Sequence, residues 1–143
     1  ATLEASDFMP FRALKDMPLG MTAHIQYSDI DSLESATCSR ILVQDIIRGR
    51  IGFDGLLMTD DLSMKALGGS LRQRAEKALA AGCDLLLHCN GVMEEMLEVA
   101  AATPPLSDEA RRRWLLAAAR RVHHPEPFDA GACRAALERL LAG

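Results

Sequence analysis

Three short apolar runs alternate along this 143-residue chain with segments of helical periodicity, and this alternation limits the fold more than any other feature. The runs span residues 19–25, 56–58 and 83–89. The middle run, LLM, has no polar alternation, which is typical of a strand covered on both faces in a parallel sheet. Repeated β–α units of this kind predict an α/β fold with a parallel sheet.

Helices are predicted before, between and after these strands. Asp7, Thr37 and Ser107 are candidate N-caps, because short polar side chains accept hydrogen bonds from the exposed N–H groups of a first turn. Gly82 is predicted to end the third helix in the left-handed conformation. The predicted helices span residues 8–14, 39–50, 71–81, 93–101, 107–122 and 130–141, with a linker at 124–128.

Composition and charge argue against several classes of protein. The formal net charge is −4 and no long basic run occurs, which argues against a nucleic-acid partner. No apolar stretch approaches the roughly 20 residues that span a bilayer, and the first residues do not resemble a signal peptide. The four cysteines match no common zinc spacing. Cys83 and Cys89 are predicted to be reduced core residues, which suits the cytoplasm.

Polar side chains follow each predicted strand. His24 lies near the end of the first run, Asp60 and Asp61 follow the second, and the third ends in the sequence HCN at 88–90. In parallel α/β folds, ligands bind beyond the carboxyl ends of the strands. We therefore expect the two acids to lie just beyond the carboxyl end of their strand, outside its buried part, and to form a site there.

The two acids are expected to differ in role. Asp61 precedes a short turn and is interpreted mainly as a structural cap, whereas Asp60, the first polar group after the strand, is the candidate for chemistry. Such an acid can attack an anomeric carbon, accept a phosphoryl group or bind a metal. The chain has neither a phosphate-binding glycine loop nor a cluster of further metal ligands. His24 fits a core position and a site position equally well, and His88 is interpreted as structural.

The stretch IRGRIGFDGLLMTDDLSMKAL, Ile47 to Leu67, resembles glycoside hydrolase family 3, in particular the bacterial β-N-acetylhexosaminidases that act on cell-wall fragments. Five further segments, DFMPF, MTAHI, SATCS, AGCD and LHCNG, fall in the order of that family. The resemblance covers roughly residues 5 to 100, and the helices beyond it are generic.

The resemblance implies a (β/α)₈ barrel, of which this chain matches the C-terminal three βα units followed by extra helices. Three units are too few to close an eight-stranded barrel. We expect residues 1–122 to be the C-terminal part of the catalytic barrel, and residues 123–143 to be a linker and a C-terminal helix. The family's acid/base histidine, in a motif like KHFPGHG, belongs upstream of Asp7 and is absent. Because the chain begins with Ala1 instead of methionine, we expect a piece of a longer protein.

The activity implied by the resemblance is retaining hydrolysis of terminal β-linked N-acetylglucosamine from GlcNAc-anhydro-muropeptides, during peptidoglycan recycling in the cytoplasm. It requires no cofactor and no metal. Asp60 matches the family nucleophile, Asp61 would support it, and His24 and Met21 are candidate substrate contacts. The alternative is a catalytically inactive fragment that acts as an interaction or assembly unit, by self-association or with a complementing N-terminal barrel portion.

Overall fold

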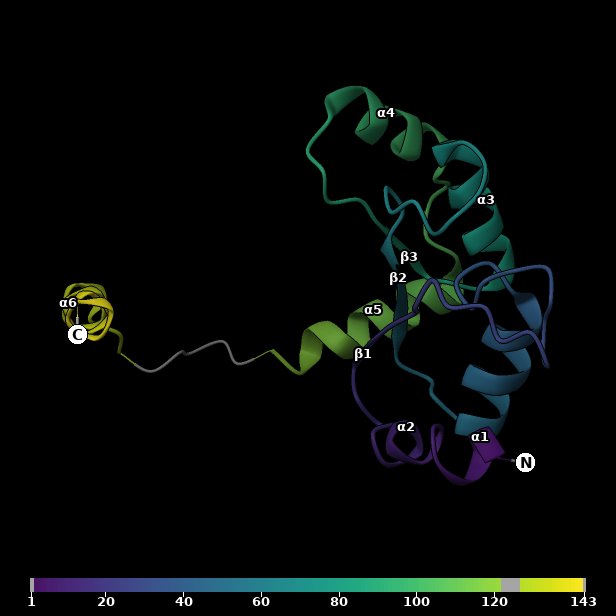
Figure 1. Cartoon of the computed structure of the whole chain (residues 1–143), viewed down its shortest axis with the longest axis horizontal. Coiled ribbons are helices and arrows are strands. Elements are labelled where there is room, and N and C mark those ends of the chain that lie inside the picture. Colours follow the sequence, from purple (N-terminus) through teal and green to yellow (C-terminus); the bar gives the residue numbers. More distant parts are fainter. Residues whose placement is uncertain (1, 122–126, 143) are drawn as a thin grey trace.

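The computed structural model describes residues 2–121 and 127–142 and has the predicted order of strands and helices (Figure 1). A short helix at the N-terminus, α1, is an addition to the prediction. The elements are α1 (Thr2–Ala5), α2 (Met9–Ala13), β1 (Leu19–Met21), the π-helix η1 (Ile41–Ile51), β2 (Leu56–Asp61), α3 (Leu71–Ala81), β3 (Leu85–Leu87), α4 (Met93–Ala102), α5 (Asp108–Ala119) and α6 (Ala130–Leu141).

The three strands form one parallel sheet in the order β1–β2–β3, as the alternation of strands and helices predicts. Leu19 pairs with Leu56 and Met21 with Met58, in regular register. Between β2 and β3 the register shifts after Met58, so that Asp61 is the next residue of β2 to pair, with Leu87. The chain therefore folds as consecutive β–helix–β units.

The strand boundaries differ from the prediction at the ends where the polar groups lie. The first and third strands are shorter than expected, whereas β2 continues through Asp60 and Asp61. The expectation that the two acids lie beyond their strand is therefore wrong. Asp61 pairs with Leu87, and the Leu87 carbonyl also accepts a hydrogen bond from the Leu62 N–H at 2.9 Å. Backbone pairing with β3 thus extends the strand, although the acidic side chains remain partly exposed.

The helix caps are only partly as predicted. Ser70 and Ser107 accept hydrogen bonds from the first turns of α3 and α5, and Gly82 ends α3 with a φ of 114°. Thr37 does not cap η1, because its hydroxyl is buried among side chains near the end of β1. Asp7 gives no capping hydrogen bond to α2, whose N-cap is Phe8.

The C-terminal part agrees with the prediction where it is described. α5 ends at Ala119, short of the expected residue 122, which lies outside the described residues together with 124–126 of the expected linker. α6 has the predicted bounds, and Asp129 caps it through the Ala132 N–H. Within residues 2–121 and 127–142, no helix is both long enough and apolar enough to cross a bilayer.

Helices η1 and α3 cover one face of the sheet (Figure 1). Leu57 of β2 packs against this layer, and the ring of Phe53 lies so close to Gly20 that a Cβ there would be 2.8 Å from it. The main buried cluster comprises Phe8, Ala36, Leu42, Val43, Ile46, Ile51, Phe53, Leu57, Ala78, Ala81 and Cys83. Burial in this cluster raises the pKa of the Cys83 thiol to about 12, so Cys83 is an inert core residue.

All four cysteines are unpaired, and they do not share one environment. Cys83 is buried, whereas Cys89 is exposed, so the expectation that Cys89 belongs to the core is wrong. Cys89 follows β3 by two residues, at the end of the sheet where the strand has already terminated.

The opposite face of the sheet is covered only in part. Because side chains alternate along a strand, Leu56 and Met58 face away from η1 and α3. α5 contacts β2 and crosses the sheet in Figure 1, and Leu56 is fully buried. Leu19 and Met21 on the same face of β1 are 50% and 53% exposed. Among the described residues, no strand pairs with the outer edge of β1 or of β3.

A buried ion-pair cluster joins η1, β3 and α5 where the strands begin. The Asp84 carboxylate accepts from Arg48 at 2.8 Å, from Arg113 at 2.9 Å and from the Leu57 N–H at 2.9 Å. Arg48 also donates to the Phe53 carbonyl at 2.9 Å. Burial, followed by the charge of Arg113, lowers the pKa of Arg48. The carboxylate thus neutralises two cations and holds β2 in place.

The variant Asp84→Ala tests the importance of this cluster. The side chains of Asp84 and Arg48 are only 5% and 12% exposed, so removing the carboxylate leaves a buried cation without its partner. We expect the free energy of unfolding, measured in urea, to fall by about 3–5 kcal/mol. Asp45→Ala, on the exposed face of η1, is the control and should change it by about 0.5 kcal/mol or less. Equal effects of the two variants would contradict this account.

Candidate active site

The buried hydroxyl of Thr59 shapes the end of β2. Its Oγ1 accepts a hydrogen bond from the Leu87 N–H at 2.9 Å, in place of a strand carbonyl. This contact coincides with the register shift between Met58 and Asp61. The Thr59 hydroxyl thus continues the hydrogen bonding to β3 across the irregularity and fixes the position of the two acids that follow.

The Asp61 carboxylate is saturated with hydrogen-bond donors. Oδ1 accepts from the Ser63 N–H at 3.0 Å and from the Cys89 N–H at 3.1 Å, and Oδ2 accepts from the Ser63 hydroxyl at 2.6 Å. Partial burial raises the pKa of Asp61, but the Ser63 and Cys89 hydrogen bonds outweigh it and bring the pKa below its usual value. Asp61 therefore joins the end of β2 to the loop that follows β3.

The Asp60 carboxyl group has different surroundings from that of Asp61. Its Oδ1 accepts from the backbone N–H of Asp61 at 2.8 Å, and the side chain is partly exposed. The register irregularity between Met58 and Asp61 interrupts the alternation of side chains along β2. The two acids differ in their donors: the Asp61 carboxylate accepts three hydrogen bonds, whereas the Asp60 carboxyl group accepts from the Asp61 N–H.

His24 links the end of β1 to the end of β2. Its Nε2 lies 2.9 Å from the Asp61 carbonyl oxygen, which can only accept, so Nε2 carries the proton in this contact. Its Nδ1 lies 2.7 Å from the Thr37 hydroxyl. That hydroxyl also lies 2.9 Å from the Thr22 hydroxyl and 3.2 Å from the Ala23 carbonyl. The ring of His24 is therefore fixed at both nitrogens.

The turn after β2 is anchored separately. Leu62 is fully buried in a second apolar cluster with Leu67, Ala75 and Val99. Arg74 of α3 donates to the Leu62 carbonyl at 2.8 Å and to the Met64 carbonyl at 3.2 Å. The sequence LSM after the two acids is therefore held by core packing on one side and by a guanidinium group on the other.

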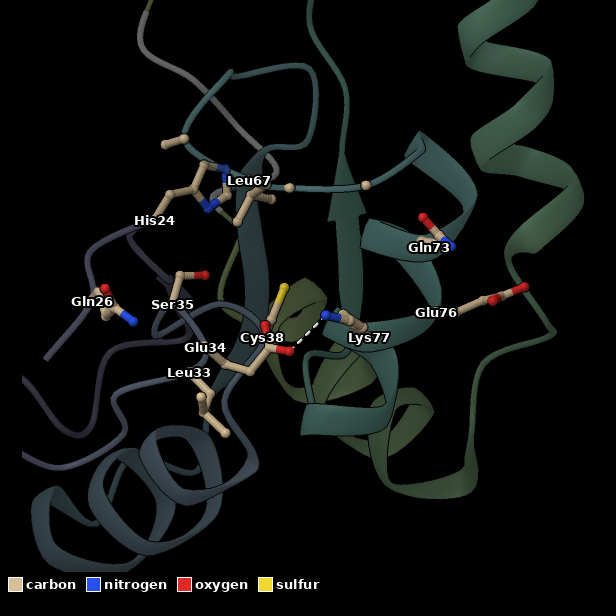
Figure 2. Close-up of a pocket in the computed structure, with 13 residues that line it drawn as sticks. His24, Gln26, Leu33, Glu34, Ser35, Cys38, Leu67, Gln73, Glu76 and Lys77 are labelled. Carbon is tan, nitrogen blue, oxygen red and sulfur yellow. Dashed lines mark hydrogen bonds and ion pairs between the residues drawn. The ribbon is translucent and has the colours of Figure 1, made fainter. Parts of the chain in front are cut away.

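A cavity of about 660 Å³ lies beside this site, between the loop before η1 and the start of α3 (Figure 2). His24 lines it, together with Ser35, Cys38 and the ion pair between Lys77 and Glu34, whose atoms are 2.6 Å apart. Neither acid is among the described residues that line it. The two acids therefore lie outside the cavity.

The structure brings three of the four predicted site residues together. The Asp61 N–H donates to the Asp60 carboxyl group, and His24 contacts the Asp61 carbonyl. Met21 pairs in register with Met58, two residues before Asp60. Within residues 2–121 and 127–142, no group of three or more His, Cys, Asp or Glu side chains could hold a metal ion.

Sequence reasoning missed the hydroxyl residues that hold these groups. Thr22 and Thr37 are 4% and 0% exposed, and their hydroxyls form a buried pair that supports His24. Thr37 was predicted only as a helix cap. The usable signal is a polar residue within an apolar run, as in MTAHI, because a buried hydroxyl needs a hydrogen-bond partner nearby.

A parallel sheet that presents acidic side chains at the carboxyl ends of its strands is the architecture of (β/α)-type enzyme domains. The model for the glycosyl hydrolase family 3 N terminal domain matches residues 1–123, and the chain belongs to this family. The resemblance identified in the sequence is thus confirmed.

The relatives extend well beyond this chain. A β-hexosaminidase of Chromobacterium violaceum is 43% identical over 117 residues, which are 79% of this chain and 32% of that protein. NagZ from Neisseria gonorrhoeae has 33% identity and a TM-score of 0.69, over 81% of this chain and 33% of that structure. A family 3 β-N-acetylglucosaminidase from Paenibacillus sp. gives 25% identity and a TM-score of 0.72, over 85% and 26%. The chain thus spans about a third of its curated relatives' length.

The lowered pKa of Asp61 predicts how the free energy of unfolding depends on pH. A carboxylate whose pKa in the folded state lies below its usual value of 3.8 stabilises the fold above that value, and this contribution disappears as the pH falls through the folded pKa. Asp61→Asn should therefore lower the free energy of unfolding most near neutral pH, and the difference from wild type should shrink in acid. Urea unfolding across this pH range measures it.

The variant Ser63→Ala sharpens the test, because it keeps the acid and removes the donor hydroxyl. The pKa of Asp61 should rise toward its usual value, so the stability that Asp61 contributes near neutral pH should be smaller, and its loss on acidification should be complete at a higher pH than in wild type. A difference between wild type and Asp61→Asn that does not vary with pH would contradict the argument.

Proposed function

We propose that this chain is the part of a retaining glycoside hydrolase that carries the nucleophile, Asp60, and that the enzyme removes terminal β-linked N-acetylglucosamine. The observation that carries the proposal is the position of Asp60 at the carboxyl end of β2, with a partly exposed carboxyl group that accepts fewer hydrogen bonds than that of Asp61. In a (β/α)₈ barrel the active site lies at the C-terminal ends of the strands. In retaining enzymes a carboxylate there attacks the anomeric carbon and forms a covalent glycosyl-enzyme.

The surrounding residues suit supporting roles. Asp61 is occupied by three donors, so its part is to fix the strand end that carries Asp60. His24 braces that end through the Asp61 carbonyl and is proposed to lie beside the bound sugar. Met21, half exposed at the end of the neighbouring strand β1, is proposed as an apolar contact for the sugar.

Completion of the site is proposed to come from the rest of the barrel. We infer that residues 1–122 are the C-terminal three βα units, with residues 123–143 as an appended linker and helix. The half-exposed Leu19 and Met21 lie where an adjoining barrel wall would cover them. The missing part would also supply the general acid, which contributes about 10²–10⁴-fold to such reactions. No cofactor takes part in this mechanism.

The substrate class is proposed from the relatives. NagZ from Neisseria gonorrhoeae has been solved in complex with N-trifluoroacetyl-D-glucosamine, an analogue of N-acetylglucosamine. We propose the same terminal sugar here, carried on cell-wall muropeptides and released during peptidoglycan recycling in the cytoplasm.

A second function, favoured by the unpaired edge of β1 and its half-exposed side chains, is that of a catalytically inactive assembly unit. An exposed strand edge is a template for pairing with another chain. In this reading the chain associates with itself or with an N-terminal barrel portion, and Asp60 has no chemical role. The two functions differ in what happens when a partner completes the barrel.

The test is complementation. The chain is combined with the portion of the Chromobacterium violaceum β-hexosaminidase that precedes the matched region, and hydrolysis of a chromogenic β-N-acetylglucosaminide is measured. We expect no turnover by the chain alone, since the general acid is missing, and turnover by the pair. Asp60→Asn in the pair should reduce kcat by at least about 10³-fold, because loss of the nucleophile removes the covalent pathway.

The matched control is Asp61→Asn, which removes the adjacent acid but keeps Asp60. We expect it to retain measurable activity, with a smaller loss than Asp60→Asn. Wild-type turnover in the Asp60→Asn pair would refute the assigned nucleophile. A pair that forms but never turns over would favour the assembly unit.

A further inference from the structure

His88, the first residue after β3, has an environment that packing alone does not explain. Its side chain is 6% exposed, yet Nδ1 is buried without a hydrogen-bond partner among the described residues. An orphaned buried polar atom is costly, and such groups in folded proteins call for a reason beyond stability. An apolar side chain would fill the same place without that cost.

The other ring nitrogen of His88 is firmly engaged. Nε2 lies 3.0 Å from Oε2 of Glu95, in the first turn of α4. The same oxygen accepts a short hydrogen bond from Asn90 Nδ2. The Asn90 hydrogen bond, followed by that of His88, lowers the pKa of Glu95. The carboxylate can only accept, so His88 Nε2 carries the proton in this contact.

These contacts fix the course of the loop between β3 and α4. Asn90 Oδ1 accepts from the Val92 N–H at 2.9 Å, and Gly91 adopts a φ of +74° between them. His88 and Asn90 lie on either side of Cys89, and both bind the carboxylate of Glu95. They therefore hold the loop to α4. The Cys89 N–H, held between these two residues, donates to Asp61 at 3.1 Å.

We propose that His88 is a positioning residue for the two adjacent acids. By donating to Glu95, His88 fixes the loop after β3 and keeps the Cys89 N–H against the Asp61 carboxylate. This contact holds the strand end that carries Asp60. The chain of contacts runs from α4 through β3 to β2 without a gap. The proposal rests on the proposed role of Asp60, but the contacts themselves do not depend on it.

The Cys89 hydrogen bond also acts on the charge state of Asp61. Burial raises the pKa of Asp61, and the Ser63 and Cys89 hydrogen bonds lower it. Loss of the histidine should therefore alter Asp61 by loosening the Cys89 N–H. A residue that served only to fill space would not do so.

The test uses the chain itself and two substitutions of His88. His88→Val fills the space without a donor, whereas His88→Gln presents an N–H at a position similar to that of Nε2. In His88→Val we expect hydrogen exchange of the Cys89 amide to accelerate about five- to thirtyfold, the change that follows from losing one hydrogen bond. The Asp61 carboxyl, followed by carbon NMR, should titrate at a higher pH. His88→Gln should restore the slow exchange.

A second route avoids changing a buried residue. Glu95→Ala removes the acceptor of His88 from a partly exposed position and should accelerate Cys89 exchange in the same way. Glu94→Ala, at the neighbouring exposed position of α4, is the matched control for charge and helix propensity and should leave Cys89 and Asp61 unchanged.

Slow Cys89 exchange and an unchanged Asp61 titration in both His88→Val and Glu95→Ala would overturn the proposal. Equal acceleration in His88→Gln and His88→Val would also overturn it, because the donor would then be irrelevant. These readouts require no turnover, so they are separate from the complementation test of Asp60. If the complementation test refuted Asp60 as the nucleophile while the exchange and titration effects were observed, His88 would remain a positioning residue for the acid pair without a link to catalysis.

Discussion

The ends of all three strands are held together through one residue, Asp61. Its carboxylate accepts from the Cys89 N–H after β3 and from Ser63 in the following turn, and its carbonyl accepts from His24 after β1. Two adjacent acids would repel each other if they shared one environment. Here the two carboxyl groups have different surroundings, because three hydrogen bonds from Ser63 and Cys89 stabilise the charge of Asp61. Asp60 is thereby left with a fixed backbone and a partly exposed carboxyl group.

The other end of β2 is equally constrained. Asp84 accepts from the Leu57 N–H near the start of this strand and is neutralised by Arg48 and Arg113. A reactive group is positioned most reliably on an element whose supporting residues are themselves held by packing and hydrogen bonds. β2 is supported in this way at both ends. At its beginning the support comes from the ion pairs of Asp84, and near the acids it comes from hydrogen bonds with uncharged donors. The proposed chemistry of Asp60 depends on this rigidity.

Much of this organisation could be predicted from the sequence, because apolar runs and helical periodicity report directly on burial. The order of elements, the parallel sheet and the glycine that ends α3 all follow from such patterns. The strand ends could not be predicted, since Thr59 and Asp61 continue β2 by contacts with β3 that no local pattern records. The buried hydroxyl of Thr37 was missed for the same reason: it is paired with residues 13 to 15 positions away.

The exposed sheet face connects this architecture to the proposed enzyme, because a barrel wall must cover it before a sugar can be enclosed. The most direct measurement is mass spectrometry of the complemented barrel after reaction with a fluorinated N-acetylglucosaminyl donor that traps the glycosyl-enzyme. The account predicts that the peptide containing Asp60 gains the mass of one sugar, and that Asp60→Asn abolishes this gain. A label on a different peptide, or turnover without any label on Asp60, would contradict it.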